Sequence, residues 1–237
     1  MNVSYRARDR VRAELTREIK EAARRQLSAE GAAALSLRAV ARELGMASSA
    51  IYRYFPSRDD LLTALIVDAY NALGETAEAA DASCPRNGFA LRWLTVCRAI
   101  RDWGIEHPNE YALIYGSPVP GYHAPEERTV PPATRVAAVL GGQLDDASRA
   151  GVLQSPLTCP ALPPSVAEAA KRVRDVLGAQ VPDDMVARGL MAWTYIFGAV
   201  TFELFGHWKN TVGEYSEFFD YTVDCMRQIV GLPEGDF

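Results

Sequence analysis

Cysteine and histidine are scarce in this chain, and their scarcity argues against several kinds of site. The four cysteines, Cys84, Cys97, Cys159 and Cys225, are widely separated, form no Cys-x-x-Cys motif and have no histidine pair nearby. A zinc site needs ligands that are clustered in such motifs. We therefore interpret the cysteines as buried or incidental thiols, and we expect no metal and no other cofactor.

Sequence motifs of enzymes are also missing. The chain contains no Gly-x-Ser-x-Gly, no phosphate-binding glycine loop, no His-Glu-x-x-His and no paired-carboxylate motif. Its three histidines, at positions 107, 123 and 207, are scattered and suggest no catalytic set. We therefore do not expect an enzyme.

No segment alternates apolar and polar residues over the length of a strand, so we expect an all-α fold. Apolar residues make up 49% of the chain and charged residues 23%, which favours a chain that folds throughout. Prolines separate segments of helical length. We expect a first helix around 15–27, a long helix from Ser57 to about Ala80, and further helices over 87–107, 109–116, 133–149, 165–180, 183–208 and 214–230.

One apolar run, from Leu190 to Trp208, is long enough for a membrane span to be considered. Polar residues interrupt it, Glu203 is its only carboxylate, and no second span is present. We therefore interpret it as a helix buried between its own core and a partner subunit. Because no apolar segment follows the basic N-terminal residues, no secretory signal is indicated and a cytoplasmic location is expected.

Charge is distributed unevenly along the chain. Residues 1–58 carry 12 Arg and Lys against 6 Asp and Glu, a net charge of +6, whereas residues 59–237 carry 13 against 24, a net charge of −11. A basic segment on an acidic body favours binding of a polyanion at one end only. We expect two domains, 1–60 and 61–237.

Residues 36–55 have the pattern of a helix-turn-helix. Ser36 can cap the first helix, and Gly45 can adopt the positive φ of the turn that follows. The inward face of the first helix is expected to be Leu37, Val40, Ala41 and Leu44, and that of the second Ile51, Tyr54 and Phe55. The second helix of this motif enters the DNA major groove by its N-terminal end. A plain helical hairpin is the alternative.

The same segment resembles the DNA-binding domain of the tetracycline-repressor (TetR) family over residues 12–66. The resemblance is carried by Leu37-Arg-Ala-Val-Ala-Arg-Glu-Leu-Gly-Met46 and by Ile51-Tyr-Arg-Tyr-Phe-Pro-Ser-Arg-Asp-Asp-Leu-Leu62. It implies a three-helix N-terminal DNA-binding domain, followed by a larger helical domain that dimerises, binds a small molecule and releases DNA.

The resemblance also implies residues that contact DNA. Tyr52 and Arg58 would each contact a phosphate, Ser36 would join them, and Ser48, Ser49 and Arg53 would face the groove. Ala47 stands where the family usually has a hydroxyl residue that caps the recognition helix, so the cap is expected to pass to Ser48. No lysine lies near position 48, so base reading is expected to rest on Arg38 and Arg53, with phosphate contact as the alternative.

The N-terminal arm Tyr5-Arg-Ala-Arg-Asp-Arg-Val-Arg12 is rich in arginine. Such an arm can follow the DNA backbone or enter the minor groove. A mobile, solvated segment is the alternative.

The stretch from His107 to Pro125 resembles a C-terminal ligand-domain subtype found among TetR-like regulators. Segment 117–132 contains five prolines, so we expect a long, stiff connection that is either the wall or lid of a site or a rigid surface loop. Aromatic residues at helical spacing favour a pocket for a small, mostly apolar effector. We expect it to be lined by Trp93, Cys97, Tyr111, Tyr115, Trp193 and Phe197.

The last two expected helices, 183–208 and 214–230, are expected to form a four-helix homodimer interface. The small residues Ala192, Gly198 and Ala199 allow close helix approach on the first of them. Glu203 and His207 are four residues apart and are expected to pair at an interface edge, with cation binding as the alternative.

These observations favour a ligand-responsive DNA-binding transcriptional regulator, and among regulators they favour a repressor. It would bind a near-palindromic operator as a homodimer and be released by a small molecule. Two alternatives stay open: a small helical enzyme, and a DNA-binding protein whose body senses a protein partner or nothing.

Overall fold

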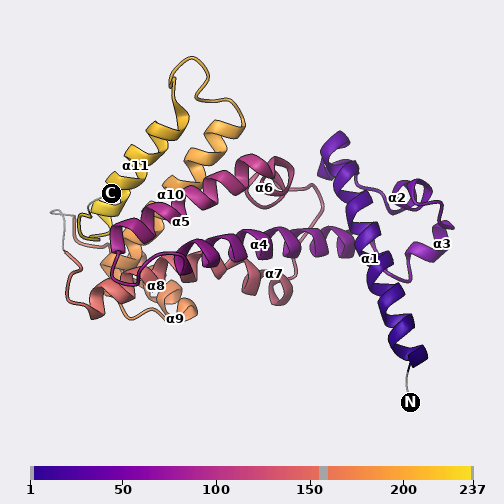
Figure 1. Ribbon diagram of the computed structural model, residues 1–237, viewed down its shortest axis with the longest axis horizontal. Coiled ribbons are helices and arrows are strands. Elements are labelled where there is room, and N and C mark those ends of the chain that lie inside the picture. Colours follow the sequence, from indigo (N-terminus) through magenta and orange to yellow (C-terminus); the bar gives the residue numbers. More distant parts are fainter. Residues whose placement is uncertain (1–2, 155–159, 236–237) are drawn as a thin grey trace. The chain divides into compact units, whose positions relative to one another are not determined.

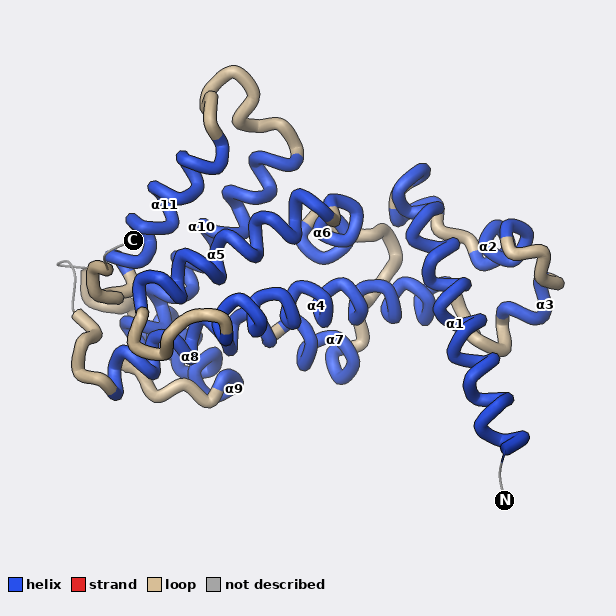
Figure 2. The backbone as a smooth tube through the Cα atoms, in the orientation of Figure 1, coloured by secondary structure: helices blue, strands red, loops and turns tan. Residues whose placement is uncertain are grey.

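The computed structural model describes residues 3–154 and 160–235, with side chains from Arg8 onward, and every regular element in those ranges is a helix (Figures 1 and 2). The prediction of an all-α fold is confirmed. The chain forms two compact units, one of residues 1–69 with 109–129 and one of residues 70–108 with 130–237. The boundary at residue 60 stays a prediction, because one continuous helix runs through that position.

The N-terminal unit contains the helices α1 (Val3–Glu30), α2 (Leu37–Glu43) and α3 (Ser48–Ile51), with a 3₁₀ turn η1 (Ala32–Ala34) before α2. The first part of α4 (Arg58–Ala82), α6 (Pro108–Tyr115) and the start of α7 (Glu126–Ala133) complete it. The C-terminal unit contains the rest of α4, with α5 (Phe89–Glu106), α8 (Arg135–Arg149), α9 (Pro164–Leu177), α10 (Asp183–Leu204) and α11 (Tyr215–Ile229).

Helix ends in the N-terminal unit follow the local signals of the sequence. Gly31 ends α1 with a φ of +79°, and Gly45 makes the turn after α2 with a φ of +64°. The Ser36 hydroxyl accepts the Ala39 N–H at 3.5 Å at the start of α2. The Ser57 hydroxyl accepts the Asp60 N–H at 3.0 Å and donates to the Asp60 carboxylate at 2.7 Å, so Ser57 caps α4 at the position where the sequence predicted the start of a long helix.

The arginine-rich segment at the N-terminus is helical. Helix α1 begins at Val3, so residues 5–12 form its first turns and not an extended arm (Figure 1). The side chains of Tyr5 and Arg6 lie outside the described residues. A role of this segment in DNA binding stays a prediction.

The expectation that 117–132 is a connection without helix is wrong in one respect, because this segment contains most of the helix α7. Two carboxylates, Glu126 and Glu127, lie in its first turn, where the helix dipole favours negative charge. The Pro125 carbonyl accepts the Arg128 N–H at 3.0 Å and the Thr129 N–H at 3.1 Å. Pro131 and Pro132 lie inside the helix and supply no N–H, which is why the sequence pattern did not predict it.

Segment 109–129 belongs to the N-terminal unit although it follows α5 in the chain. The Asn109 amide donates to the Ser28 hydroxyl at 3.0 Å, and the hydroxyls of Tyr122 and Thr63 are 2.9 Å apart. These bonds join α6 and the following loop to α1 and to the first part of α4. The helix-turn-helix is therefore packed with a segment that sequence order alone would assign to the second domain.

Helix α10 lies in the core of the C-terminal unit and packs on α5, α8, α9 and α11. By length and composition it could cross a membrane, and 39% of its most apolar window is buried. Packing against four helices is the environment of a core helix, as the sequence predicted for one side of it. The Trp93 indole N–H of α5 donates to the Val223 carbonyl of α11 at 2.8 Å, which links the neighbouring helices.

The expectation that Glu203 and His207 pair is wrong. Glu203 accepts two hydrogen bonds from the Arg101 guanidinium of α5, at 2.8 and 2.6 Å. Helix α10 ends at Leu204, so the spacing of four residues no longer places His207 on the same helical face. The His207 ring instead lies 5.0 Å from the Phe202 ring.

A buried ion network joins α4, α5 and α8. The Arg92 side chain is 1% exposed and donates to both carboxylate oxygens of Asp81, at 2.9 and 3.0 Å. It also donates to the Asp146 carboxylate at 3.0 Å. Gln143, which is fully buried, donates to Asp81 at 2.8 Å. The Arg92 guanidinium is therefore buried, and its two carboxylate partners are partly buried.

Candidate DNA-binding surface and effector cavity

The helix-turn-helix is held by a small core. Val40 and Ala41 of α2, Ile51 of α3 and the following Phe55 are buried, and Tyr54 is half-buried. Ala41 is fully buried with no side chain beyond Cβ, which allows α2 and α3 to approach closely. Ile51, Tyr54 and Phe55 therefore face the unit, as expected, but α3 ends at Ile51, so Tyr54 and Phe55 lie in the turn after the helix and not on it.

The opposite side of the motif is polar and exposed. Ser48 and Ser49 in the first turn of α3 are exposed, as are Arg38 on α2 and Arg53 after α3, while Tyr52 is 43% exposed. Ser36 is half-buried at the start of α2. The structure thus brings these six predicted DNA-contact residues onto α2, α3 and their ends.

The cap of α3 differs from the expectation. The N-cap residue is Ala47, and no side chain supplies a capping hydrogen bond there. Ser48 is instead the first helical residue, so the cap does not pass to it. The end of α3 that would enter a groove therefore keeps its N–H groups without a side-chain cap.

Arg12 of α1 makes contacts with Arg53 and Tyr54 that the sequence did not predict. Its guanidinium donates to the Arg53 carbonyl at 3.4 Å and lies 5.8 Å from the centre of the Tyr54 ring. A cation over an aromatic face is weakly attractive. Arg12 thereby links α1 to the turn that follows α3. Its spacing in the sequence carries no signal for this contact.

Arg58, at the start of α4, points into the N-terminal unit. Its guanidinium donates to the carbonyls of Leu35 at 3.1 Å, Ala32 at 2.9 Å and Ala33 at 3.3 Å. A fourth contact reaches the Asp59 carboxylate at 3.4 Å. The Arg58 side chain was expected to contact a DNA phosphate, but most of its N–H donors are engaged by acceptors within the protein.

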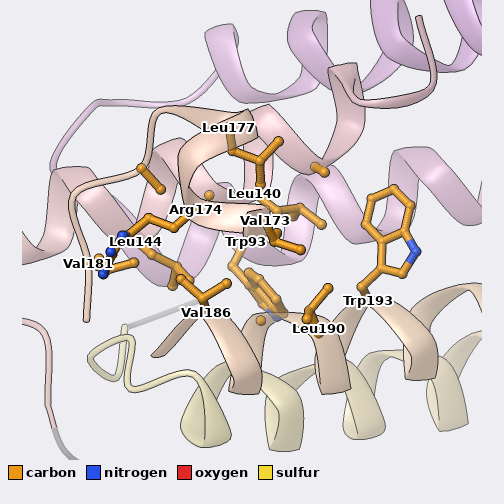
Figure 3. A pocket seen from close by; sticks show the side chains of 14 residues that line it. Trp93, Leu140, Leu144, Val173, Arg174, Leu177, Val181, Val186, Leu190 and Trp193 are labelled. Carbon is orange, nitrogen blue, oxygen red and sulfur yellow. The ribbon is translucent and has the colours of Figure 1, made fainter. Parts of the chain in front are cut away.

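The C-terminal unit contains a partly open cavity of about 130 Å³ between α5, α8, α9 and α10 (Figure 3). Fourteen of the described residues line it, and Arg174 is the only charged one among them. Its walls include Trp93, Leu140, Leu144, Val173, Leu190 and Trp193. In Figure 3, Arg174 and Trp193 lie at opposite ends of the lining. An apolar cavity with few polar groups is typical of a small-molecule site.

The cavity takes in two of the six residues expected at an effector site, Trp93 and Trp193. Cys97 and Phe197 are buried nearby on α5 and α10 but are not part of the lining. Tyr111 and Tyr115 belong to the N-terminal unit, where their ring centres are 5.2 Å apart. Aromatic spacing along the sequence found the α5 and α10 walls and missed α8 and α9, whose lining is mostly aliphatic.

Metal chemistry has no candidate among the residues that the structure describes. Within 3–154 and 160–235, no three His, Cys, Asp or Glu side chains come together as ligands. Cys97 is fully buried, and burial raises the pKa of its thiol. Cys159 lies outside the described residues.

A helix-turn-helix with an exposed polar face, joined to a helical unit with an apolar cavity, defines a DNA-binding regulator of transcription. The family model for bacterial regulatory proteins of the tetR family matches residues 19–65, and the model for the tetracyclin repressor-like C-terminal domain matches residues 93–226. The chain therefore belongs to the TetR family of transcriptional regulators, which is not a family of enzymes.

Relatives support the same assignment along most of the chain. The HTH-type transcriptional regulator Rv1816 of Mycobacterium tuberculosis (strain ATCC 25618 / H37Rv) is 41% identical over 199 residues, which are 83% of each protein. The protein SCO4313, whose crystal structure is known, is 30% identical, and the match covers 92% of this chain and 97% of that one, with a TM-score of 0.76. The TetR-family regulator PfmR of Thermus thermophilus is 16% identical with a TM-score of 0.55 over 91% of this chain and 99% of its own, and shows the fold alone.

Proposed function

We propose that this regulator is a ligand-responsive repressor that binds a near-palindromic operator as a homodimer and is released by a small apolar molecule. The observation that carries the DNA part is the exposed polar face of α2 and α3 within a segment whose net charge is +6. A cytoplasmic location follows from the same role, because the operator is in the cytoplasm.

The first turn of α3 enters the major groove in this proposal. Ser48 and Ser49 leave space for close approach, and the uncapped N–H groups of α3 face the DNA. Arg38 and Arg53 read guanine or contact phosphate, and Tyr52 contacts a phosphate. The Ser36 hydroxyl accepts the Ala39 N–H, so its own hydrogen is available to donate to a phosphate.

Exposed apolar residues on α10 support the homodimer. Met191, Phe202 and Phe205 are exposed along one side of this helix, and a Cβ added at Gly198 on the same side meets nothing within 4 Å. Tyr221 of α11 is 69% exposed. Two copies of α10 and α11 would cover these residues in a two-fold interface. The two DNA-binding units would then reach successive major grooves, about 34 Å apart.

The cavity supports the effector part of the proposal. An effector lowers DNA affinity only if it binds the two conformations of the protein unequally. The cavity lies among four helices of the C-terminal unit, so its occupation would change how these helices pack. Cys97, Tyr111, Tyr115 and Phe197 stay predicted effector residues, although they are not part of the cavity lining.

The DNA part is tested with a duplex that the protein selects from a random library. Tyr52→Ala and Arg53→Ala are expected to weaken binding by at least about tenfold, as loss of a charge-assisted contact does. Arg172→Ala is the matched control, because Arg172 is an exposed arginine on α9 outside the proposed interface. Unchanged affinity in both Tyr52 and Arg53 variants would refute the assigned interface.

A body that senses a protein partner instead of a small molecule is the remaining candidate. DNA binding that is indifferent to a metabolite library would favour that function. The cavity argues for the small molecule, since a protein partner needs a broad contact surface and this apolar cavity has a volume of only about 130 Å³.

A further inference from the structure

The effector cavity combines small size with almost complete absence of available polar groups. Its volume of about 130 Å³ is close to that of an apolar cavity of roughly 150 Å³, lined by Leu, Ile and Phe side chains, which binds benzene. The indole N–H of Trp93 is engaged by the Val223 carbonyl. A molecule in this space therefore meets apolar surface with little opportunity for hydrogen bonds.

The one charged lining residue is already neutralised. Arg174 pairs with the Asp183 carboxylate through Nη1, and its Nε lies 3.9 Å from Asp175. An anionic ligand would have to share Arg174 with Asp183, because the single positive charge of the lining is already balanced by a carboxylate. The two side chains are 28% and 34% exposed, so water also screens the charge of Arg174. The lining thus offers an incoming carboxylate no uncompensated positive charge, and it offers a cation no carboxylate of its own.

Two glycines keep the cavity open. A Cβ added at Gly141 of α8 lies 4.0 Å from Leu177, and one added at Gly189 of α10 lies 3.8 Å from Leu144, both ordinary contact distances. Both glycines line the cavity, so any larger side chain at these positions would extend into it. The volume therefore depends on the absence of side chains at two positions of the wall.

We propose that the effector is a neutral, apolar molecule of about one aromatic ring. This inference rests on the proposed ligand response for its regulatory meaning, but binding itself is measured without DNA. Toluene and benzoate form the matched probe pair, since they share the ring and differ in charge. Decanoate tests an elongated anionic chain.

Calorimetric titration of the full-length protein measures the three affinities directly. We expect toluene to bind and benzoate and decanoate to bind at least about tenfold more weakly, because their carboxylates must be desolvated. Gly141→Leu is expected to abolish toluene binding. The control is Gly142→Leu, on the same helix, where an added Cβ meets nothing within 4 Å and the residue does not line the cavity.

Several results would overturn the assignment: no toluene binding, equal or tighter binding of either carboxylate, or toluene binding that survives Gly141→Leu. If Gly141→Leu does not fold, Gly189→Ala takes its place, because its added Cβ is only in ordinary contact. Toluene binding without any change in DNA affinity would refute the ligand response and leave the ligand class intact.

A second and independent observation concerns Arg58. A guanidinium has five N–H donors, and four contacts of Arg58 are made inside the protein. Three of them end on carbonyls of the connection between α1 and α2, from Ala32 to Leu35, directly before the Ser36 cap. Arg58 thus ties the start of α4 to the start of α2.

The geometry points to Arg58 as a positioning residue that places α2, and with it α3, for DNA binding. A planar fork is needed to reach several carbonyls at once, and an ammonium group cannot replace it. A phosphate contact, in contrast, needs only the positive charge. Arg58→Lys therefore separates the two roles, with Arg58→Gln as the charge-removing variant.

Affinity for the selected duplex is measured as a function of salt concentration. Each phosphate contact contributes about 0.9 to the slope of log K against log salt. We expect Arg58→Lys and Arg58→Gln to lose affinity alike, by about tenfold, with the slope unchanged. A merely stabilising role would move the melting temperature and leave the affinity of the folded protein as in wild type.

The positioning role is overturned if Arg58→Lys binds DNA like wild type while Arg58→Gln reduces the slope of log K against log salt by about 0.9, the contribution of one phosphate contact. It is also overturned if both variants are less stable but bind DNA normally at low temperature. Should Arg58→Gln fail to fold, Arg58→Lys decides alone. If Arg58→Lys also fails to fold, the positioning role is overturned in favour of a purely structural one.

Discussion

Replacement of Arg92 by methionine tests the buried ion network. The guanidinium makes two hydrogen bonds to Asp81 and one to Asp146 with only 1% of its side chain exposed. Methionine keeps much of the volume and removes the charge, which leaves two partly buried carboxylates without their shared cation. Removal of one partner of a buried pair typically costs about 3–5 kcal/mol.

The expected cost for Arg92→Met is at the lower end, about 3 kcal/mol. The reason is that Arg86 also contacts Asp81 at 2.9 Å and Asp146 at 3.2 Å and would remain after the substitution. Because the Arg86 side chain is 70% exposed, its contacts are screened by water and replace only part of the loss.

Urea unfolding followed by circular dichroism measures this difference. With a slope of about 2–3 kcal/mol per molar urea, the midpoint should fall by about 1–1.5 M. The control is Arg98→Met, on the same helix: Arg98 makes an equally close two-bond pair with Asp220, but its side chain is 50% exposed. That pair should contribute only about 0.2–1 kcal/mol. Equal midpoints for the two variants would refute the argument that burial, and not geometry, sets the cost.

Three further predictions follow from titratable groups and exposed surface. Burial by itself would raise the pKa of Asp81, but the hydrogen bonds from Arg92 and Gln143 lower it below its ordinary value. Stability from this group is therefore present above about pH 4 and lost as pH falls through the lowered pKa, a trend that urea midpoints below pH 4 should show in wild type and much less in Asp81→Asn. Cys97 is fully buried and burial raises the pKa of its thiol, whereas Cys84 is half-buried. Maleimide labelling of the native protein should therefore be unchanged by Cys97→Ser and reduced by Cys84→Ser. A drop in labelling with Cys97→Ser would contradict the burial of this thiol. Tyr221 is 69% exposed on α11, so Tyr221→Glu should convert the proposed homodimer to a monomer in sedimentation experiments, and persistence of a dimer would move the proposed interface away from this part of α11.

Local signals in the sequence predicted most helix boundaries, because they act within a few residues. Ser36, Gly45 and the Ser57 cap each determine a nearby turn of backbone, and the structure shows them in those roles. Helix α7 shows the limit of such rules. Its two internal prolines argue against a helix, but the carboxylates of its first turn and the hydrogen bonds to the Pro125 carbonyl support one.

Only the tertiary structure decided which partners distant residues take. Arg58 stands in a position that sequence similarity associates with phosphate, yet the carbonyls of a connection more than twenty residues earlier engage it. Glu203 pairs with Arg101 on another helix, and the cavity takes in the aliphatic walls of α8 and α9 that carry no aromatic stripe.

By itself, then, the sequence determined the class of fold, the helix-turn-helix and the basic character of the N-terminal segment. These properties are additive or local: charge sums along the chain, and helical periodicity and capping involve residues up to four positions apart. The engagement of Arg58 and the size and neutrality of the cavity depend on side chains brought together from separate helices. Their geometry arises only when those helices pack, so no local pattern encodes it.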